Sequence, residues 1–94
     1  MALNWANDQP RNFYDQLHAS GDPAFPALKS ALDDIEANPG SAAARHRSFE
    51  AVIAPPPVWL VHVRHPSGDL QILWQEDPQG DPAPLWIGAA RFRI

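Results

Sequence analysis

The chain has 94 residues, a net charge of −4 with neutral histidines, and a hydrophobic fraction of 45%. This composition is typical of a globular protein, and the length suits one domain over residues 1–94. The acidic balance argues against a simple polyanion binder, and the lack of cysteine excludes disulfides, cysteine zinc sites and thiol nucleophiles. Because no run is apolar enough to span a membrane and the start lacks a signal-peptide pattern, we expect a cytoplasmic protein without a membrane partner.

The first half of the chain predicts an edge strand over residues 3–7 and then two helices. Asp8 is the expected N-cap of the first helix, and Gly21 is its expected stop. Asp22 followed by Pro23 predicts the start of the second helix. Apolar residues three and four apart form one face of this second helix: Phe25, Leu28, Leu32 and Ile35. The short turn between the helices predicts an antiparallel helical hairpin.

The second half predicts strands. The triple proline at 55–57 should form an extended connector, because proline lacks the amide that a sheet needs. Strands are expected over 58–64, 70–76 and 85–93, with a loop at 77–84. Alternation places three residues of the middle strand on one face: Leu70, Ile72 and Trp74. The order predicts an α+β domain in which an N-terminal helical hairpin packs on a small antiparallel sheet.

Arginines are the strongest chemical signal in the second half: Arg45, Arg47, Arg64, Arg91 and Arg93. A hairpin corner and a chain end can lie close together in a three-stranded meander, so Arg64 and Arg91 or Arg93 could share one face. Converging guanidinium groups bind an oxyanion or a phosphate. The alternative is that these arginines form ordinary ion pairs across the sheet with nearby carboxylates.

Histidines offer weaker signals. His46, His62 and His65 lack a fixed further ligand, so we expect no metal site. The chain also has no phosphate-binding glycine loop, nucleophile elbow or HExxH motif, so we expect no cofactor. The same three histidines are candidates for proton transfer, since imidazole titrates near neutral pH.

Three segments together resemble the RelE/ParE superfamily of bacterial toxins: LDDIEANPG, VWLVHVRHPSGDLQILWQED and LWIGAARFR. The end of the second predicted helix matches that family's pattern through Leu32, Ile35 and Pro39. The central hairpin and the last strand match it through Arg64, Gly68, Gly88, Arg91 and Arg93. The resemblance covers residues 9–93 and implies two N-terminal helices against an antiparallel sheet.

The resemblance implies a toxin of a type II toxin–antitoxin system, held inactive by a cognate antitoxin. RelE-like members are endoribonucleases that cleave mRNA on the ribosome through attack by the substrate's own 2′-OH. By position, the resemblance assigns catalytic roles to Arg64 and to Arg91 or Arg93, and it places Arg45, His46 and Arg47 where nuclease members carry basic residues. A histidine, His65 or His46, would stand in for the family's proton-transfer residue, and we expect Arg45, Arg47 and His62 to bind substrate. ParE-like members instead bind DNA gyrase and cut nothing.

Three departures keep a non-enzymatic alternative open. The chain is acidic, whereas nuclease members are basic. Asp69-Leu70-Gln71 stands where many members carry an aromatic residue and an arginine, and their C-terminal tyrosine or histidine has no counterpart before Ile94. The alternative is a gyrase inhibitor or a degenerate toxin-fold binding module. Three tryptophans would then anchor a partner, unless they belong to the core: Trp59, Trp74 and Trp86.

Overall fold

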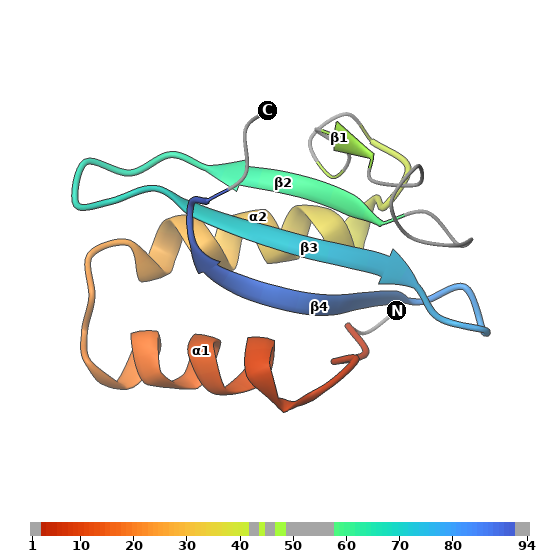
Figure 1. Ribbon diagram of the computed structural model, residues 1–94, viewed down its shortest axis with the longest axis horizontal. Helices are drawn as coiled ribbons and strands as arrows, with labels where there is room; N and C mark the ends of the chain where they lie inside the picture. The colour runs from red at the N-terminus through yellow and green to blue at the C-terminus, as the bar shows by residue number, and fades with distance from the viewer. Residues whose placement is uncertain (1–2, 42–43, 45–46, 49–57, 92–94) are drawn as a thin grey trace.

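The computed structural model describes residues 3–41, 44, 47–48 and 58–91. Along these residues the elements are α1 (Asp8–Ala19), α2 (Phe25–Ala37), β1 (Arg47–Ser48), β2 (Trp59–Val63), β3 (Leu70–Glu76) and β4 (Pro82–Ala89) (Figure 1). The strands form one antiparallel sheet in the order β1-β2-β3-β4. Helix α2 packs against β2 and α1 against β4. The predicted α+β class, with two N-terminal helices on an antiparallel sheet, is confirmed.

The N-cap of helix α1 lies one residue earlier than predicted. Asn7 is the N-cap, and its side-chain oxygen accepts a hydrogen bond of 2.9 Å from the amide of Gln9. The predicted cap, Asp8, is instead the first helical residue, where the helix dipole favours its negative charge. Asparagine and aspartate are equally good caps, so the sequence alone did not separate these two positions. Gly21 follows the helix with a φ of 67°, as a stop residue should.

Helix α2 begins at Phe25, later than the Asp22-Pro23 pair predicted. The Asp22 side chain accepts a hydrogen bond of 2.8 Å from the amide of Ala24, and its carbonyl accepts one of 3.0 Å from Phe25. These bonds make a turn that precedes the helix. The helix ends before Asn38, whose ψ of 77° is not helical because a proline follows.

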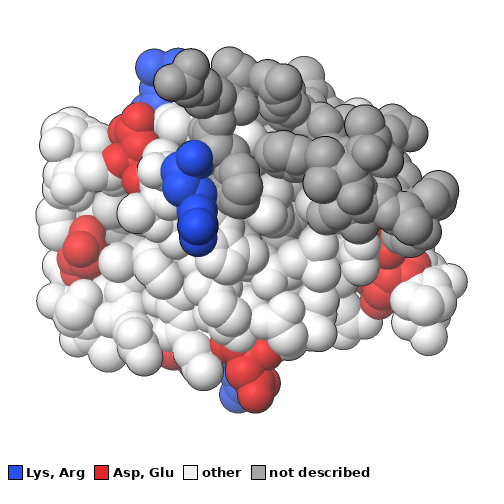
Figure 2. Space-filling view, viewed as in Figure 1, with Lys and Arg blue, Asp and Glu red and all other residues white. Residues whose placement is uncertain are grey.

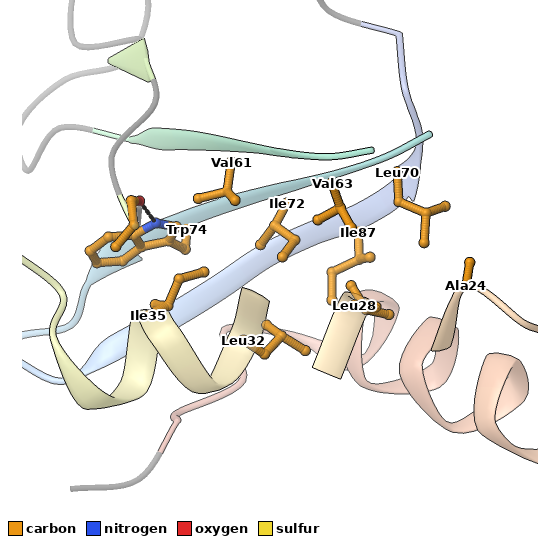
Figure 3. Packing of buried hydrophobic residues seen from close by; sticks show 11 residues of the cluster. Ala24, Leu28, Leu32, Ile35, Val61, Val63, Leu70, Ile72, Trp74 and Ile87 are labelled. Carbon is orange, nitrogen blue, oxygen red and sulfur yellow. Dashed lines mark hydrogen bonds between the residues drawn. The ribbon is translucent and has the colours of Figure 1, made fainter. Parts of the chain in front are cut away.

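The core lies between the helices and one face of the sheet (Figure 3). Leu28, Leu32 and Ile35 of α2 are at most 2% exposed, so the predicted helical stripe is buried there. Buried strand residues meet them: Val61, Val63, Leu70, Ile72, Trp74 and Ile87. The Trp74 indole donates a hydrogen bond of 2.7 Å to the carbonyl of Ala44, which satisfies its polar atom inside the core. Leu70, Ile72 and Trp74 share this face, as predicted.

Strand β4 begins inside the predicted loop at 77–84. One carboxylate oxygen of Asp77 accepts hydrogen bonds of 2.9 Å from the amides of both Gln79 and Asp81. This closes a short turn and lets the strand start at Pro82. The described strand ends at Ala89, whereas the prediction ran to residue 93. The predicted proline connector at 55–57 lies outside the described residues.

A β-bulge in β4 decides which way its side chains point. Trp74 pairs with Pro84 but Leu73 pairs with Trp86, so the register steps over Leu85. Because successive strand residues point to opposite faces, this extra residue leaves Pro84 on the helix side and turns Trp86 to the other side. We call that other side the outer face; the strands contribute to it Leu60, His62, Gln71, Leu73, Trp86 and Gly88.

The predicted edge strand at residues 3–7 is an extended segment that lies along the free side of β4. The amides of Asn4 and Ala6 donate hydrogen bonds of 2.8 and 3.0 Å to the carbonyls of Pro82 and Pro84. The pairing is parallel, and in a parallel ladder residue 84 would return a bond to Asn4. Proline has no amide to do so, which makes the pairing one-sided.

The side chain of Gln9 continues this cover along β4. Its amide group donates a hydrogen bond of 2.7 Å to the carbonyl of Ile87 and accepts one of 3.0 Å from the Ile87 amide. The Asn7 side chain donates to the carbonyl of Leu85 at 3.0 Å. The residues before and at the start of α1 therefore hold this edge of the sheet.

Candidate functional site

Four of the predicted site residues lie at one end of the sheet. His62 is in β2, Arg64 and His65 follow it in the β2–β3 turn, and Arg91 follows β4. Val63 pairs with Leu70, and Leu70 pairs with Ala89, so these chain segments meet. A hydrogen bond of 3.0 Å from the amide of Ala90 to the carbonyl of Asp69 closes this end.

Of the remaining predicted residues, the structure describes only the backbone of Arg47. Arg47 begins β1 and its backbone pairs with Leu60. Arg45, His46 and Arg93 lie outside the described residues. The structure therefore brings Arg64, His65, His62 and Arg91 to the same end of the sheet, and the prediction that Arg64 shares one face with Arg91 or Arg93 stays a prediction.

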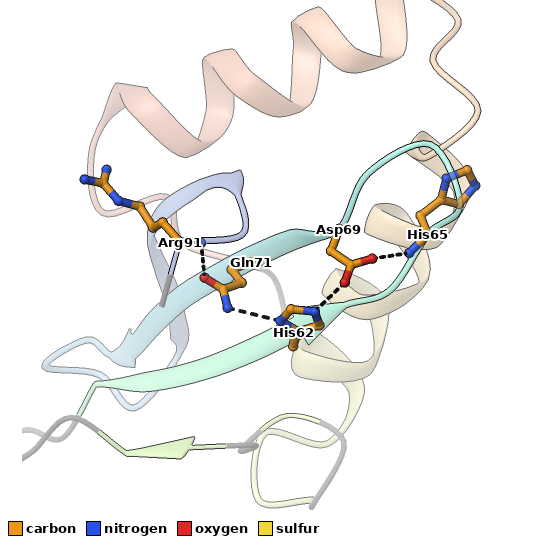
Figure 4. A network of polar contacts seen from close by, with 5 residues as sticks. All are labelled: His62, His65, Asp69, Gln71 and Arg91. Carbon is orange, nitrogen blue, oxygen red and sulfur yellow. Dashed lines mark hydrogen bonds and ion pairs between the residues drawn. The ribbon is translucent and has the colours of Figure 1, made fainter. Parts of the chain in front are cut away.

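A line of hydrogen bonds crosses this end of the sheet (Figure 4). The Arg91 amide donates to Oε1 of Gln71 at 2.9 Å, and Nε2 of Gln71 lies 3.0 Å from Nδ1 of His62. Nε2 of His62 lies 2.9 Å from a carboxylate oxygen of Asp69. The other oxygen of Asp69 accepts a bond of 3.0 Å from the amide of His65. We call these residues the polar relay: Arg91, Gln71, His62, Asp69 and His65.

The charge of Asp69 is stabilised by this relay. The amide of His65 and then the ring of His62 hold the pKa of the Asp69 carboxyl below its ordinary value of 3.8, with a smaller contribution from the positive charge of Arg64. Asp69 is therefore ionised at neutral pH.

The histidine rings are held by other protein groups. The two ring nitrogens of His62 are within hydrogen-bond distance of Asp69 and Gln71, so neither can take a proton from a substrate while the relay is intact. Nδ1 of His65 accepts a bond of 3.1 Å from the Ser67 amide and lies 2.7 Å from the Ser67 hydroxyl. Figure 4 shows the His65 ring and the Arg91 guanidinium pointing away from His62 in opposite directions. These groups share one end of the sheet without converging on one point.

Trp86 and Arg91 form a pair on the outer face. The Arg91 guanidinium carbon lies 5.7 Å from the centre of the Trp86 ring, within the range of a cation–π contact. The indole also lies against Gly88, where a Cβ would overlap with its six-membered ring. Gly88 is therefore required by a close approach and not by its backbone angles. The sequence could have predicted this contact, because Trp86 and Gly88 are two residues apart on one strand and therefore lie on the same face.

The three candidate tryptophan anchors separate clearly. Trp74 is fully buried in the core, and Trp59 packs against the core on the helix side. Trp86 is half-buried on the outer face. Figure 2 shows this side of the molecule, where uncharged surface spreads over the strands and charged side chains are few.

Among the described residues, two hollows lie away from Arg64 and Arg91. One of about 750 Å³ lies between the N-terminal segment and the β3–β4 turn, lined by residues that include Trp5, Glu76 and Asp77. A smaller one of about 290 Å³ lies between α2 and β2, with Asp34 and His62 on its walls. Neither contains Arg64, His65 or Arg91, so the predicted phosphate-binding residues do not line either of these cavities.

The described residues contain neither a metal-binding cluster nor a membrane-spanning helix. Within them, no three histidine or carboxylate side chains gather closely enough to hold a metal ion. No helix in the same part of the chain has the length and apolarity to cross a membrane.

Comparison with protein families, with curated proteins and with solved structures found no match to this chain.

Proposed function

We propose that this protein is a toxin-like component of a type II toxin–antitoxin system, with a RelE/ParE-like fold, and that it acts by binding a protein target. The order of helices and strands supports the resemblance on which the toxin proposal rests. The observation that carries the binding mode is the bulge in β4, which turns Trp86 to the outer face beside Arg91.

Trp86 and Arg91 have the chemistry of a protein-binding surface. Tryptophan and arginine are the residue types that most often dominate the binding energy of an interface, and the centre of such an interface is poor in charge. The outer face offers this pair on a largely uncharged surface (Figure 2). The cognate antitoxin is one expected partner. A cellular protein is the target, and DNA gyrase is the target that ParE-like members would suggest.

RNA cleavage is the second candidate function. It is favoured by the placement of Arg64 and Arg91 at one end of the sheet, where they could hold a phosphate. It needs a group to move the proton of the attacking 2′-OH. His62 has both ring nitrogens occupied and His65 has one bonded to Ser67, so the described histidines support binding better than proton transfer.

Expression in a bacterium, with and without the neighbouring small gene, tests the toxin proposal. Expression alone should slow growth, and the neighbouring gene should restore it. Trp86→Ala and Arg91→Ala should relieve the growth defect, whereas Arg11→Ala should not, because Arg11 lies on α1 in an exposed pair with Asp15. Normal growth at high expression of the folded wild-type protein would overturn the proposal.

Affinity and RNA mapping separate the two modes of action. Trp86→Ala should weaken binding of the captured target by about 30-fold or more, the loss expected at an interface hot spot. Transcripts from the slowed cells should show no new 2′,3′-cyclic phosphate ends. If such ends appear and Arg64→Ala removes them, the protein is a nuclease and the binding proposal is wrong.

A further inference from the structure

In the polar relay, the chemistry of the groups determines which atom donates and which accepts in each hydrogen bond. A backbone amide only donates, so the Gln71 atom that faces Arg91 must be the oxygen. The Gln71 nitrogen then faces His62, and because it too only donates, Nδ1 of His62 must accept and carry no proton. Nε2 of His62 therefore carries the proton and donates it to Asp69. The arrangement holds His62 in one neutral tautomer.

If this tautomer changes, Gln71 loses a hydrogen bond that nothing replaces. Its side chain is fully buried, at 0% exposure, so water does not replace a bond that it loses. If Nδ1 of His62 gains a proton, two donors face each other between His62 and Gln71. Turning the Gln71 amide would correct that contact, but it would place the Gln71 nitrogen against the Arg91 amide. Because a hydrogen bond to a charged ring is stronger than one between neutral groups, the turned amide is favoured and the bond to the Arg91 amide is the one lost.

We propose that the polar relay is a proton-operated latch: it fastens Arg91 to the sheet while His62 is neutral, and releases it when His62 is protonated. Its regulatory consequence rests on the proposed function, because Arg91 lies over Trp86 on the surface that we assign to the partner. Acidification would then loosen that surface and weaken partner binding.

The groups that face His62 come from three elements. Asp69, from the β2–β3 turn, accepts a hydrogen bond from Nε2 of His62. Gln71, from β3, donates to Nδ1. Asp34, from α2, lines the same small hollow as His62. Arg64 contributes positive charge near Asp69, and the Arg91 guanidinium points away from the ring (Figure 4).

The tautomer can be read directly by ¹⁵N NMR of the isolated protein. At about pH 8, Nδ1 of His62 should show the chemical shift of an unprotonated nitrogen and Nε2 that of a protonated one. The reverse assignment would overturn the proposal. This measurement uses the wild-type chain and no partner, so it can fail while the toxin proposal stands, and the growth assay can fail while the latch stands.

The release is measured by hydrogen exchange between about pH 8 and about pH 5, the interval in which histidines change charge. As His62 gains its proton, the protection factor of the Arg91 amide should fall by about fivefold or more, the change expected for one lost hydrogen bond. The Ile87 amide is the internal control, because it is held by Gln9 and not by the relay. Equal behaviour of the two amides would contradict the latch.

Two variants assign the effect to this histidine and this glutamine. His65→Ala should keep the transition, since His65 contributes only its backbone amide to the relay. Gln71→Glu should abolish it, because a carboxylate can accept from the Arg91 amide and from a protonated His62 at the same time. The Arg91 amide should then stay protected at about pH 5, with both His62 nitrogens protonated. Release of Arg91 in a folded Gln71→Glu protein would overturn the proposal.

Discussion

The two faces of this sheet use the same three strands and are held in different ways. On the helix side, Val61, Ile72 and Ile87 pack against α2 and carry no polar atoms in their side chains. The residues that follow Val61 and precede Ile72 along their strands are His62 and Gln71. They lie on the outer face and are joined by a hydrogen bond. The stability of the helix side therefore depends on close packing, and that of the outer face depends on matched hydrogen-bond donors and acceptors.

This difference teaches where the fold tolerates change. An apolar core accepts another residue of similar size, since its contacts have no direction. A relay accepts only a residue with the same donors and acceptors at the same places. Substitutions that conserve volume should therefore be mild on the helix side and costly at Gln71.

Ile72→Ala should show the largest loss of stability. Ile72 is fully buried, so removing its side chain leaves a cavity and should lower the free energy of unfolding by about 2–5 kcal/mol. Leu73→Ala is the matched control, because Leu73 is the next residue along β3 and is half-buried on the outer face. Urea denaturation measures both. Equal losses would show that the two faces do not differ as described.

Gln71→Leu tests the outer face with volume nearly unchanged. The change removes the hydrogen bonds from the side chain to the Arg91 amide and to His62, so the free energy of unfolding should fall by about 1–3 kcal/mol. Gln75→Leu, two residues along the same strand and half-buried, should change it by less than about 0.5 kcal/mol. A neutral Gln71→Leu in urea denaturation would argue that the relay adds nothing to stability.

Gly88→Ala tests the contact beneath Trp86. A methyl group there overlaps with the indole ring, so the ring must move, at a cost of about 1–3 kcal/mol in the free energy of unfolding. Tryptophan emission should shift with it. Gly40→Ala is the control, since its Cβ would come no nearer than 4.0 Å to the Asn38 side chain. If both variants match the wild type, Trp86 does not rest on Gly88.

Asp69→Asn should give the smallest effect, and that effect should depend on pH. Because hydrogen bonds from His65 and His62 lower the pKa of Asp69, its carboxylate adds stability above pH 3.8, and this is lost as pH falls through the lowered pKa. The variant should therefore be less stable at neutral pH and approach the wild type below pH 3.8. Asp15→Asn on α1 is the control. A constant difference across this range would exclude the carboxylate as its source.

Local patterns in the sequence predicted the helix side well. The stripe of Leu28, Leu32 and Ile35 and the alternation through Ile72 follow from periods of 3.6 and 2, which short segments display fully. The predicted caps of the two helices were misplaced by one and two residues, because neighbouring residues compete for the same role. The start of β4 was missed because the turn depends on which amides the Asp77 side chain accepts from.

The outer face was harder to predict, since its features depend on register. Trp86 points to the outer face because of the bulge at Leu85. The sequence around Trp86 has no pattern that predicts this extra residue. The sequence predicted that Arg64 and Arg91 or Arg93 could share one face, because a hairpin corner and a chain end can lie close together. Gln71 was treated as part of a departure from the family pattern, and its place at the centre of the relay needed the pairing of three strands.

The prolines of β4 have a consequence for how copies of this chain would behave in a crowded solution. Pro82 and Pro84 turn carbonyls toward the N-terminal segment, and neither has an amide. If residues 4–6 were pulled away, the uncovered border would present acceptors without donors there. A strand from a neighbouring molecule could form only half of a ladder on it, and edges of this kind resist fibre growth. The segment can therefore detach without turning that border into a seed for aggregation.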